Sequence, residues 1–434
     1  MKLKKVISLL LCAALALGAA GCSQGSDSSS QSAEKSGEAK KLTVWAWDDN
    51  FNVKAANIAK QYYQKKHADV SINVVSMALD DIRQKMNTAF AAENYDGMPN
   101  VVLVEDYSIG GYLQSFPGVM RDLSSIVKKD DWMSYKINAM MQDGKIYGVP
   151  FDSGVTGMFY RTDYLQKAGY TAQDMQNITW DKYIEIGKKV KEKTGVSMLQ
   201  MTSGDLTLMK IMLQSAGSWY VKDDGKTLNI TGNKALEEGL KTYQKLVKAG
   251  IVTNLSGWDA EVQAIQQGKL ATIVDGCWIA PTIQTASDQN GKWALAPTPR
   301  MTNVDGSANA SNVGGASWYV IDKVDGAATA EDFLKETFDG NVTFLNELVK
   351  EINLVSTYKH TEDFSNYKTA NPFFSGQTIY QDFNKWAGEV PTVNYGINTY
   401  AIDSIVEESI QSVTQGADIP ATMKSIEQRA AALG

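Results

Sequence analysis

A regular alternation of strand-like and helix-like segments, beginning after residue 40, constrains the fold more than any other feature. Residues 42–47, 71–77 and 101–104 are rich in β-branched and aromatic side chains. Between them, residues 53–66 and 80–92 carry apolar side chains at helical spacing. Short apolar strands separated by helices predict a parallel sheet that is covered on both faces. The chain is therefore expected to be an α/β protein.

The alternation continues to the end of the chain, which is longer than one hydrophobic core usually organises. Further strands are predicted at 146–151, 157–160, 270–274, 293–296 and 317–321, and further helices at 180–193, 234–249 and 260–267. Thr179 is a candidate N-cap for the first of these helices. About 394 residues follow position 40, so two lobes are expected. The tail from about residue 370 is irregular and aromatic at first, then helical.

The N-terminus has the pattern of a secreted lipoprotein. Three lysines fall within residues 1–5, and residues 6–20 form a mostly apolar run. The segment that ends at Cys22 is similar to a lipobox, with alanine at position 19 where leucine is commoner. We therefore expect a signal peptide at 1–21, a lipid on Cys22 and a flexible linker over 22–40. The mature protein would be anchored to the extracellular face of the cell membrane.

Charge and cysteine usage exclude several classes of protein. The net charge of −7 becomes −10 once residues 1–21, with their three lysines and no acid, are removed. Without a basic cluster, nucleic acid is not an expected partner. Cys277 alone remains after Cys12 and Cys22, so neither a disulfide framework nor a zinc site is indicated. We expect Cys277 to be a small buried side chain rather than a nucleophile. Residues 223–225 resemble the start of a calcium loop but lack its later glutamate, so a solvated turn is expected, and no metal.

Carboxylates with aromatic neighbours follow several of the predicted strands. They occur at 47–48, 105–107, 152 and 275–278. In open α/β sheets, ligands bind beyond the carboxyl ends of the strands. Carboxylates accept hydrogen bonds from hydroxyl groups, and aromatic rings stack on the apolar faces of sugar rings. The pattern therefore favours a carbohydrate, which can use both carboxylates and aromatic rings. Trp45 lies nearer the middle of its strand and is expected in the core.

Five segments resemble the family-1 extracellular solute-binding proteins, the sugar-binding proteins of ABC importers related to maltose-binding protein. They are residues 41–48 (KLTVWAWD), 148–163 (GVPFDSGVTGMFYRTD), 179–181 (TWD), 268–278 (GKLATIVDGCW) and 314–318 (GGASW). The resemblance implies a type II periplasmic-binding-protein fold, two α/β lobes joined by hinge strands around a ligand cleft. The N-terminal lobe would comprise 41–155 and 315–360, and the C-terminal lobe 156–314 and 361–434. The first two passages between them are expected near 156–161 and 309–317, and a third after the helices around 333–355.

The resemblance and the strand-end pattern together give a set of candidate substrate-binding residues. Three of them, Trp258, Trp386 and Tyr395, have packing in the core as the competing interpretation. The full set is Trp47, Asp48, Glu105, Asp106, Tyr107, Asp152, Trp219, Tyr220, Trp258, Asp275, Trp278, Gly314, Gly315, Trp318, Trp386 and Tyr395.

The expected function is the capture of a carbohydrate, an oligosaccharide rather than a monosaccharide, by closure of the cleft. A monomeric protein without cofactor or catalysis would then deliver the sugar to the permease subunits of an ABC transporter. A glycoside hydrolase is one alternative, because paired carboxylates can catalyse the hydrolysis of a sugar as well as bind it. No hydrolase motif is recognised, however. A binding protein for a polyamine, a metal chelate or glycerol phosphate is the other, because acidic and aromatic groups also suit cations.

Overall fold

The computed structural model describes residues 41–202 and 205–433. The predicted signal peptide, the lipid site at Cys22 and the linker over 22–40 lie outside the described residues. Within the described part of the chain, no helix is both long enough and apolar enough to cross a bilayer.

The first sheet has five strands in the order β2-β1-β3-β12-β6. Strand β1 pairs in parallel with both β2 and β3, as the alternating pattern predicts. Strand β12, which begins 211 residues after the end of β3, lies antiparallel to both β3 and β6. The first lobe is therefore built from distant segments. The strands are β1 (Lys41–Ala46), β2 (Ser71–Ser76), β3 (Val101–Glu105), β6 (Gly148–Pro150) and β12 (Ala316–Val320).

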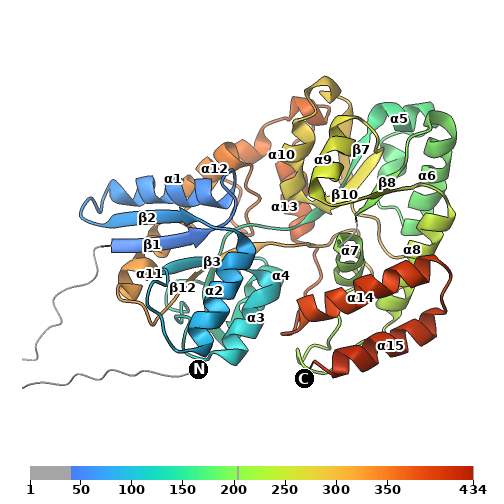
Figure 1. Cartoon of the computed structure of the whole chain (residues 1–434). Coiled ribbons are helices and arrows are strands. Elements are labelled where there is room, and N and C mark those ends of the chain that lie inside the picture. Colours follow the sequence, from blue (N-terminus) through green and yellow to red (C-terminus); the bar gives the residue numbers. More distant parts are fainter. Residues whose placement is uncertain (1–40, 203–204, 434) are drawn as a thin grey trace, which may run out of the picture. The chain divides into compact units, whose positions relative to one another are not determined.

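Helices cover both faces of this sheet. Helix α1 packs on β1 and β2 with α12 beside it, and α2 passes across the opposite face (Figure 1). Alanines on the buried side of α1 allow the helix to approach the strands closely. The helices of this lobe are α1 (Asn52–Gln64), α2 (Leu79–Ala91), α3 (Asp106–Ser115), α4 (Ser134–Ala139), α11 (Ala327–Glu336) and α12 (Val342–Ile352), and a hairpin of β4 (Met141–Gln142) and β5 (Lys145–Ile146) follows α4.

The second sheet is antiparallel, unlike the parallel pairing of β1 with β2 and β3 in the first. Its order is β10-β7-β11, with β7 (Thr156–Arg161) between β10 (Thr272–Gly276) and β11 (Trp293–Pro297). All three strands are buried along their whole length. A strand buried on both faces is apolar throughout whatever its direction, so its composition does not reveal the direction. A parallel pair, β8 (Leu199–Thr202) and β9 (Val252–Leu255), lies next to β10.

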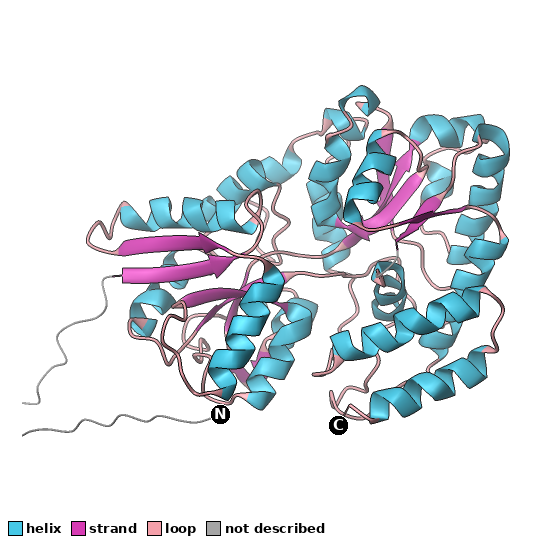
Figure 2. Cartoon of the chain, viewed as in Figure 1, coloured by secondary structure: helices cyan, strands magenta, loops and turns pink. Residues whose placement is uncertain are grey.

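The second sheet also lies between helices (Figure 2). Alternate residues of β7 contribute to two hydrophobic clusters, Phe159 to one and Met158 with Tyr160 to the other. The helices are α5 (Thr162–Lys167), α6 (Trp180–Thr194), α7 (Thr207–Ser215), α8 (Lys234–Lys248), α9 (Trp258–Gln266), α10 (Ala280–Gln284), α13 (Ile379–Ala387), α14 (Thr399–Thr414) and α15 (Ile419–Ala431). Short 3-10 turns lie at Lys129–Asp131, Gln173–Met175, Cys277–Ile279, Ser287–Gln289, Ser365–Lys368 and Pro372–Phe374.

Several local predictions are confirmed. The Thr179 hydroxyl accepts a hydrogen bond from the Lys182 backbone N–H at the start of α6. Trp45 and Cys277 are both buried. Asp224 lies in an exposed turn and accepts bonds from the chain two and three residues further on.

The chain passes between the two sheets at three places. The first passage comprises residues 151–155, between β6 and β7. Residues 156–161, where this passage was expected, are strand β7 itself, because the apolar segment pairs on both sides. The second passage leads from β11 to β12 over residues 298–315, and the third follows α12.

Candidate functional site

A cavity of about 690 Å³ lies where the first sheet's strand ends meet α9 and α10. We call it the larger cavity. Its wall includes eight of the sixteen predicted substrate-binding residues: Trp47, Asp48, Glu105, Asp152, Trp258, Trp278, Gly314 and Gly315. The structure therefore brings together residues that lie up to 268 positions apart in the sequence.

The turn after β1 presents the Asp48 carboxylate to this cavity. The Asn52 side-chain oxygen accepts hydrogen bonds from the backbone N–H groups of Trp47 and Asp48, both at 3.0 Å. Asp48 Oδ1 accepts bonds from Asn50 and Phe51 N–H. Within the described part of the chain these bonds use only Oδ1, which leaves Oδ2 to accept a hydrogen bond from a ligand.

Glu105 ends β3 and has partners on two sides. Its Oε2 atom forms an ion pair with Arg83 of α2 and accepts a 2.9 Å hydrogen bond from the Tyr400 hydroxyl of α14. The Arg83 guanidinium also lies 4.4 Å from the centre of the Tyr400 ring. These contacts fix the carboxylate at the edge of the cavity and leave Oε1 as a possible acceptor.

Asp152 lies in the first passage and is buried. Its Oδ1 atom accepts a 2.6 Å hydrogen bond from the Ala316 backbone N–H. Burial raises the pKa of this carboxyl, and the nearby charge of Lys136 opposes that rise. Gly315, beside it, has a φ of 97°, a conformation that glycine adopts more easily than any other residue.

Three tryptophans supply aromatic surface to the cavity. Trp258 is 48% exposed, which is unusual for so large an apolar side chain. Its ring centre lies 6.4 Å from that of Trp278, and the Trp278 indole N–H donates to the Val313 carbonyl at 3.2 Å. Trp47, which follows β1 in the first lobe, is half-buried and also lines the cavity. This arrangement offers apolar faces beside free carboxylate oxygens.

Four predicted residues instead form a buried aromatic cluster: Tyr107, Trp219, Tyr220 and Tyr395. The Tyr107 ring stacks on Trp219 at 5.6 Å and meets Tyr395 edge-on at 4.7 Å. Polar atoms of the cluster are satisfied, since the Trp219 N–H donates to Thr399 and the Tyr220 hydroxyl donates to Asp403. None of the four lines the larger cavity.

The remaining predicted residues also lie away from the larger cavity. Trp318 is fully buried between Phe151 and Phe338. Trp386 packs against Phe383. Asp275 is buried, and desolvation followed by the negative charge of Asp205 raises the pKa of its carboxyl. Asp106, together with Tyr395, borders a second, smaller cavity of about 480 Å³.

The larger cavity also contains residues that sequence reasoning missed. Asn50, Thr282, Glu351 and Asn353 all contribute to its wall. Asn353 ends α12 in the left-handed conformation, and its side-chain oxygen accepts a hydrogen bond from the Tyr380 hydroxyl. The sequence signals a helix end here, but it does not indicate that this end reaches the cavity.

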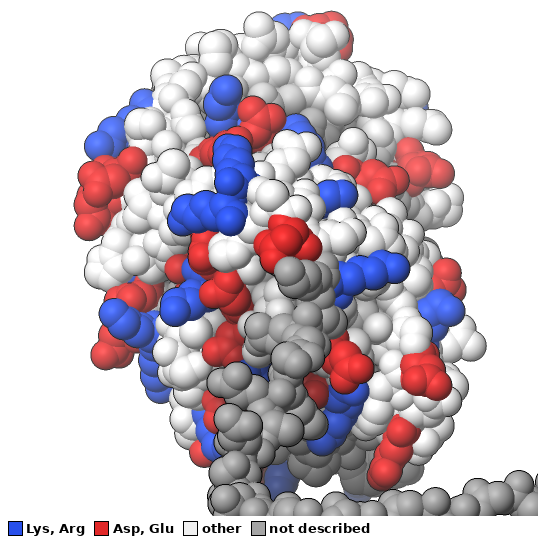
Figure 3. Space-filling view, turned by 90° about the vertical axis from the view of Figure 1, so that its left-hand side faces the viewer, with Lys and Arg blue, Asp and Glu red and all other residues white. Residues whose placement is uncertain are grey.

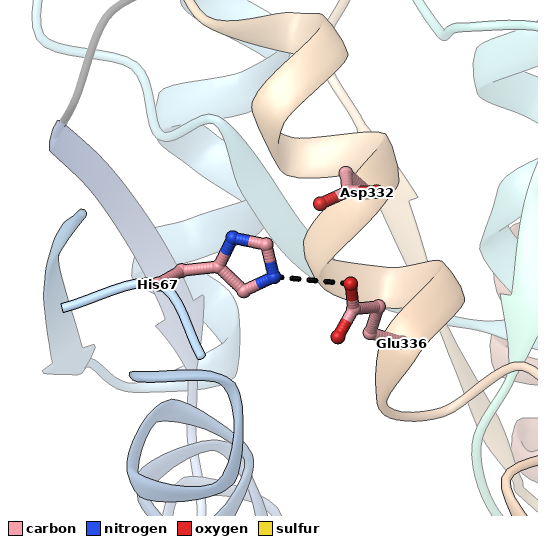
Figure 4. A group of neighbouring side chains, drawn as sticks. All are labelled: His67, Asp332 and Glu336. Carbon is pink, nitrogen blue, oxygen red and sulfur yellow. Dashed lines mark hydrogen bonds and ion pairs between the residues drawn. The ribbon is translucent and has the colours of Figure 1, made fainter. Parts of the chain in front are cut away.

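One group of side chains in the described residues could place three ligand atoms around a metal ion: His67, Asp332 and Glu336 (Figure 4). The His67 Nε2 atom lies 3.0 Å from Glu336 Oε1. The Tyr63 hydroxyl donates to Asp332 at 2.8 Å, and Lys66 lies 3.4 Å from Glu336. These partners satisfy the two carboxylates without an ion.

On the face of the molecule shown in Figure 3, basic and acidic side chains are interspersed.

Residues 58–343 match the family model described as bacterial extracellular solute-binding protein. A lactose-binding protein from Rhizobium radiobacter is 41% identical over 393 residues, 91% of this chain and 93% of that protein. An arabinooligosaccharide-binding protein from Bacillus subtilis is 26% identical over 79% of this chain and 78% of that protein.

Among solved structures, the galacto-N-biose/lacto-N-biose I-binding protein of an ABC transporter from Bifidobacterium longum, in complex with lacto-N-biose, superposes with a TM-score of 0.74. It is 20% identical and covers 92% of this chain and 97% of its own. This likeness confirms the predicted type II periplasmic-binding-protein fold.

Proposed function

The chain belongs to the bacterial extracellular solute-binding proteins, and from this premise we propose that it captures a carbohydrate for an ABC importer. The larger cavity is the proposed binding site. The ligand would be released to the permease subunits of the importer in the membrane. The proposal includes a monomeric protein that carries a lipid on Cys22 and does not alter its ligand.

The observation that carries the proposal is the exposed Trp258 beside Trp278 in a cavity with available carboxylate oxygens. Exposing a tryptophan to water is unfavourable, and a ligand with an apolar face would cover it. Asp48 and Glu105 would accept hydrogen bonds from the ligand's hydroxyl groups. The volume of about 690 Å³ falls within the range of about 300–1,000 Å³ that is usual for small-molecule sites.

A galactose-containing disaccharide or short oligosaccharide is the ligand class we propose to test first. The support is the relative that is 41% identical, which is a lactose-binding protein. The wall of the larger cavity contains Asp48, Glu105, Asp152 and Glu351. Glu105, Asp152 and Glu351 each pair with a lysine or arginine, so an anionic sugar would be repelled most by Asp48, and we expect neutral sugars to bind better than acidic ones.

The same acidic wall favours a cation, which makes a polyamine the second candidate. An ammonium group between aromatic rings and carboxylates is a stable arrangement. A polyamine, however, does not need the extended apolar faces that three tryptophans offer.

The proposed mechanism is ligand-dependent closure of the two lobes. A sugar that contacts both parts of the cavity wall binds the closed state more tightly than the open state. The population then shifts by the difference in binding free energy between the two states.

Calorimetric titration of the secreted chain, with Cys22→Ser so that no lipid attaches, tests this proposal. The panel comprises lactose, raffinose, maltotriose, arabinotriose, sialyllactose and spermidine. Saturable binding of a neutral sugar, recovered unchanged by chromatography, supports the proposal. Binding of spermidine alone would support the second candidate and contradict the first.

A further inference from the structure

Lys136, a residue that no sequence motif singles out, is the only lysine that is buried in the described part of the chain, with an exposed fraction of zero. It lies on α4, within the first lobe. Burying an ammonium group is unfavourable unless its charge and its hydrogen-bond donors are matched. The burial of Lys136 therefore indicates that the groups around it need its charge and its hydrogen bonds.

The Lys136 ammonium group makes three short hydrogen bonds. It donates to Asp106 Oδ1 and Oδ2, at 3.0 and 2.8 Å, and to the Ala316 carbonyl at 2.7 Å. It also lies 3.8 Å from Asp152 Oδ1. The ammonium therefore stands between two carboxylates and the backbone that begins β12.

These contacts join two passages between the lobes. Asp152 belongs to the first passage, and its Oδ1 accepts a bond from the N–H of Ala316, the first residue of β12 after the second passage. The Asp106 N–H donates to the Gly315 carbonyl at 3.0 Å. A β-carbon on Gly315 would lie 2.9 Å from Asp106 Oδ2 and 3.3 Å from Lys136 Nζ. A side chain at this position would displace the Asp106 carboxylate, and the φ of 97° also favours glycine.

We propose that Lys136 is a positioning residue for ligand binding, which holds Asp152, Gly315 and Ala316 in place in the wall of the larger cavity. The inference rests on the proposed function, because Asp152 and Gly315 are assigned there to the binding site. Lys136 itself does not line the cavity. It acts through its neighbours.

The charges around Lys136 determine what its removal would do. Asp106 on α3 and Asp152 in the first passage face it directly, with the Ser317 hydroxyl of β12 at 3.4 Å from Asp106. Tyr319 of β12 and Tyr395 before α14 lie near Asp106, and Cys277 lies near Asp152. No second cation is among these groups. Burial already raises the pKa of Asp106 to about 6, against the lowering effect of Lys136.

Without the lysine, both carboxyls would become protonated at higher pH than in the unchanged protein. A protonated Asp152 accepts hydrogen bonds poorly, so binding should be weakest at low pH and recover as the pH rises. A purely structural loss would instead weaken binding equally at every pH.

The test compares Lys136→Met, Lys136→Arg and the unchanged secreted chain, by calorimetric titration of the best sugar of the panel between pH 5.5 and 8.5. We expect Lys136→Met to weaken binding at least tenfold at pH 5.5 and distinctly less at pH 8.5. Lys136→Arg should restore most of the affinity and flatten the pH profile. The control Lys245→Met, which removes a lysine paired with Asp181 and Glu238 on the second lobe, should leave the affinity and its pH profile unchanged.

A double variant covers the case in which Lys136→Met does not fold. Lys136→Met with Asp106→Asn removes one charge of each sign, so the buried net charge is unchanged, and Asp152 still lacks its cation. The same pH-dependent weakening is expected of it. If the variants bind sugar as tightly as the unchanged chain at every pH, or lose affinity equally at every pH, the inference about Lys136 is overturned and the proposed function is not. If the unchanged chain binds no sugar, the proposed function fails and the inference with it.

Discussion

The larger cavity and the buried aromatic cluster contain the same kinds of residue in opposite environments. In the cavity, Trp258 is half exposed, and Asp48 Oδ2 has no hydrogen-bond partner among the described residues. In the cluster, Trp219 is 1% exposed, and Asp403 accepts a bond from Tyr220 and lies near Lys210. An aromatic side chain next to a carboxylate is therefore not in itself a binding site. Such a pair can bind a ligand only where the fold leaves the aromatic face exposed and a carboxylate oxygen without a hydrogen bond.

The aromatic residues of the two regions also affect different free energies, that of folding and that of ligand binding. In the cluster, aromatic burial and hydrogen bonds contribute to the folding free energy. In the cavity, exposed aromatic surface is a cost that a ligand can remove. Variants in the two regions should therefore affect different measurements, which makes the comparison testable.

The largest effect is expected for Trp219→Ala in the buried cluster. The substitution leaves a cavity next to Tyr107 and Tyr395 and removes the hydrogen bond to Thr399. The free energy of unfolding should fall by about 3–5 kcal/mol, as measured by urea denaturation. A loss below about 1 kcal/mol would show that the cluster is not a packed core.

Trp258→Ala in the larger cavity should show the opposite pattern. We expect affinity for the best sugar to fall about tenfold or more, or about 1.4 kcal/mol, by calorimetric titration. Because Trp258 is 48% exposed, stability should change by less than about 0.5 kcal/mol. Unchanged affinity would remove Trp258 from the proposed site.

Asp403→Asn tests whether the cluster carboxylate affects folding through its protonation. Burial raises the pKa of Asp403, against the effects of Lys210 and Tyr220. The stability that protonation of Asp403 contributes is therefore complete below its ordinary pKa of 3.8 and is lost as the pH rises through the folded-state pKa. The difference in unfolding free energy, unchanged chain minus variant, should fall steadily as the pH rises above about 4. A difference that is constant with pH would contradict this.

The smallest effects are expected for the neighbouring pair Asp48 and Asp49. Asp48 lines the larger cavity, whereas Asp49 is exposed and does not. Asp48→Asn should weaken sugar binding several-fold, about 1 kcal/mol, and Asp49→Asn less than twofold. Equal effects of the two substitutions would indicate that net charge, rather than a specific acceptor, matters.

The sequence predicts helices and their ends better than it predicts strand direction or the burial of individual side chains. The capping hydroxyl of Thr179 and the left-handed Gly195 at the end of α6 are local features, and such features can be read from neighbouring residues. Strand direction in the second sheet is not local, because a strand buried on both faces is apolar in either direction. The exposure of Trp258 and the burial of Trp219 both depend on distant segments.

The network of Lys136, Asp106 and Asp152 shows why part of the site could not be predicted. Lys136 lies 180 positions from Ala316, whose carbonyl it contacts. Neither its own helix nor the spacing of neighbouring residues indicates that it is buried. Glu351 and Asn353 of the larger cavity were missed for the same reason, since only the fold brings α12 to the strand ends.

A crystal structure of the secreted chain with the best sugar of the panel would test the central proposal most directly. We predict that the sugar lies in the larger cavity, with a ring against Trp258 or Trp278 and hydroxyl groups within hydrogen-bonding distance of Asp48 and Glu105. A sugar bound in the smaller cavity, beside Asp106 and Tyr395, would contradict it.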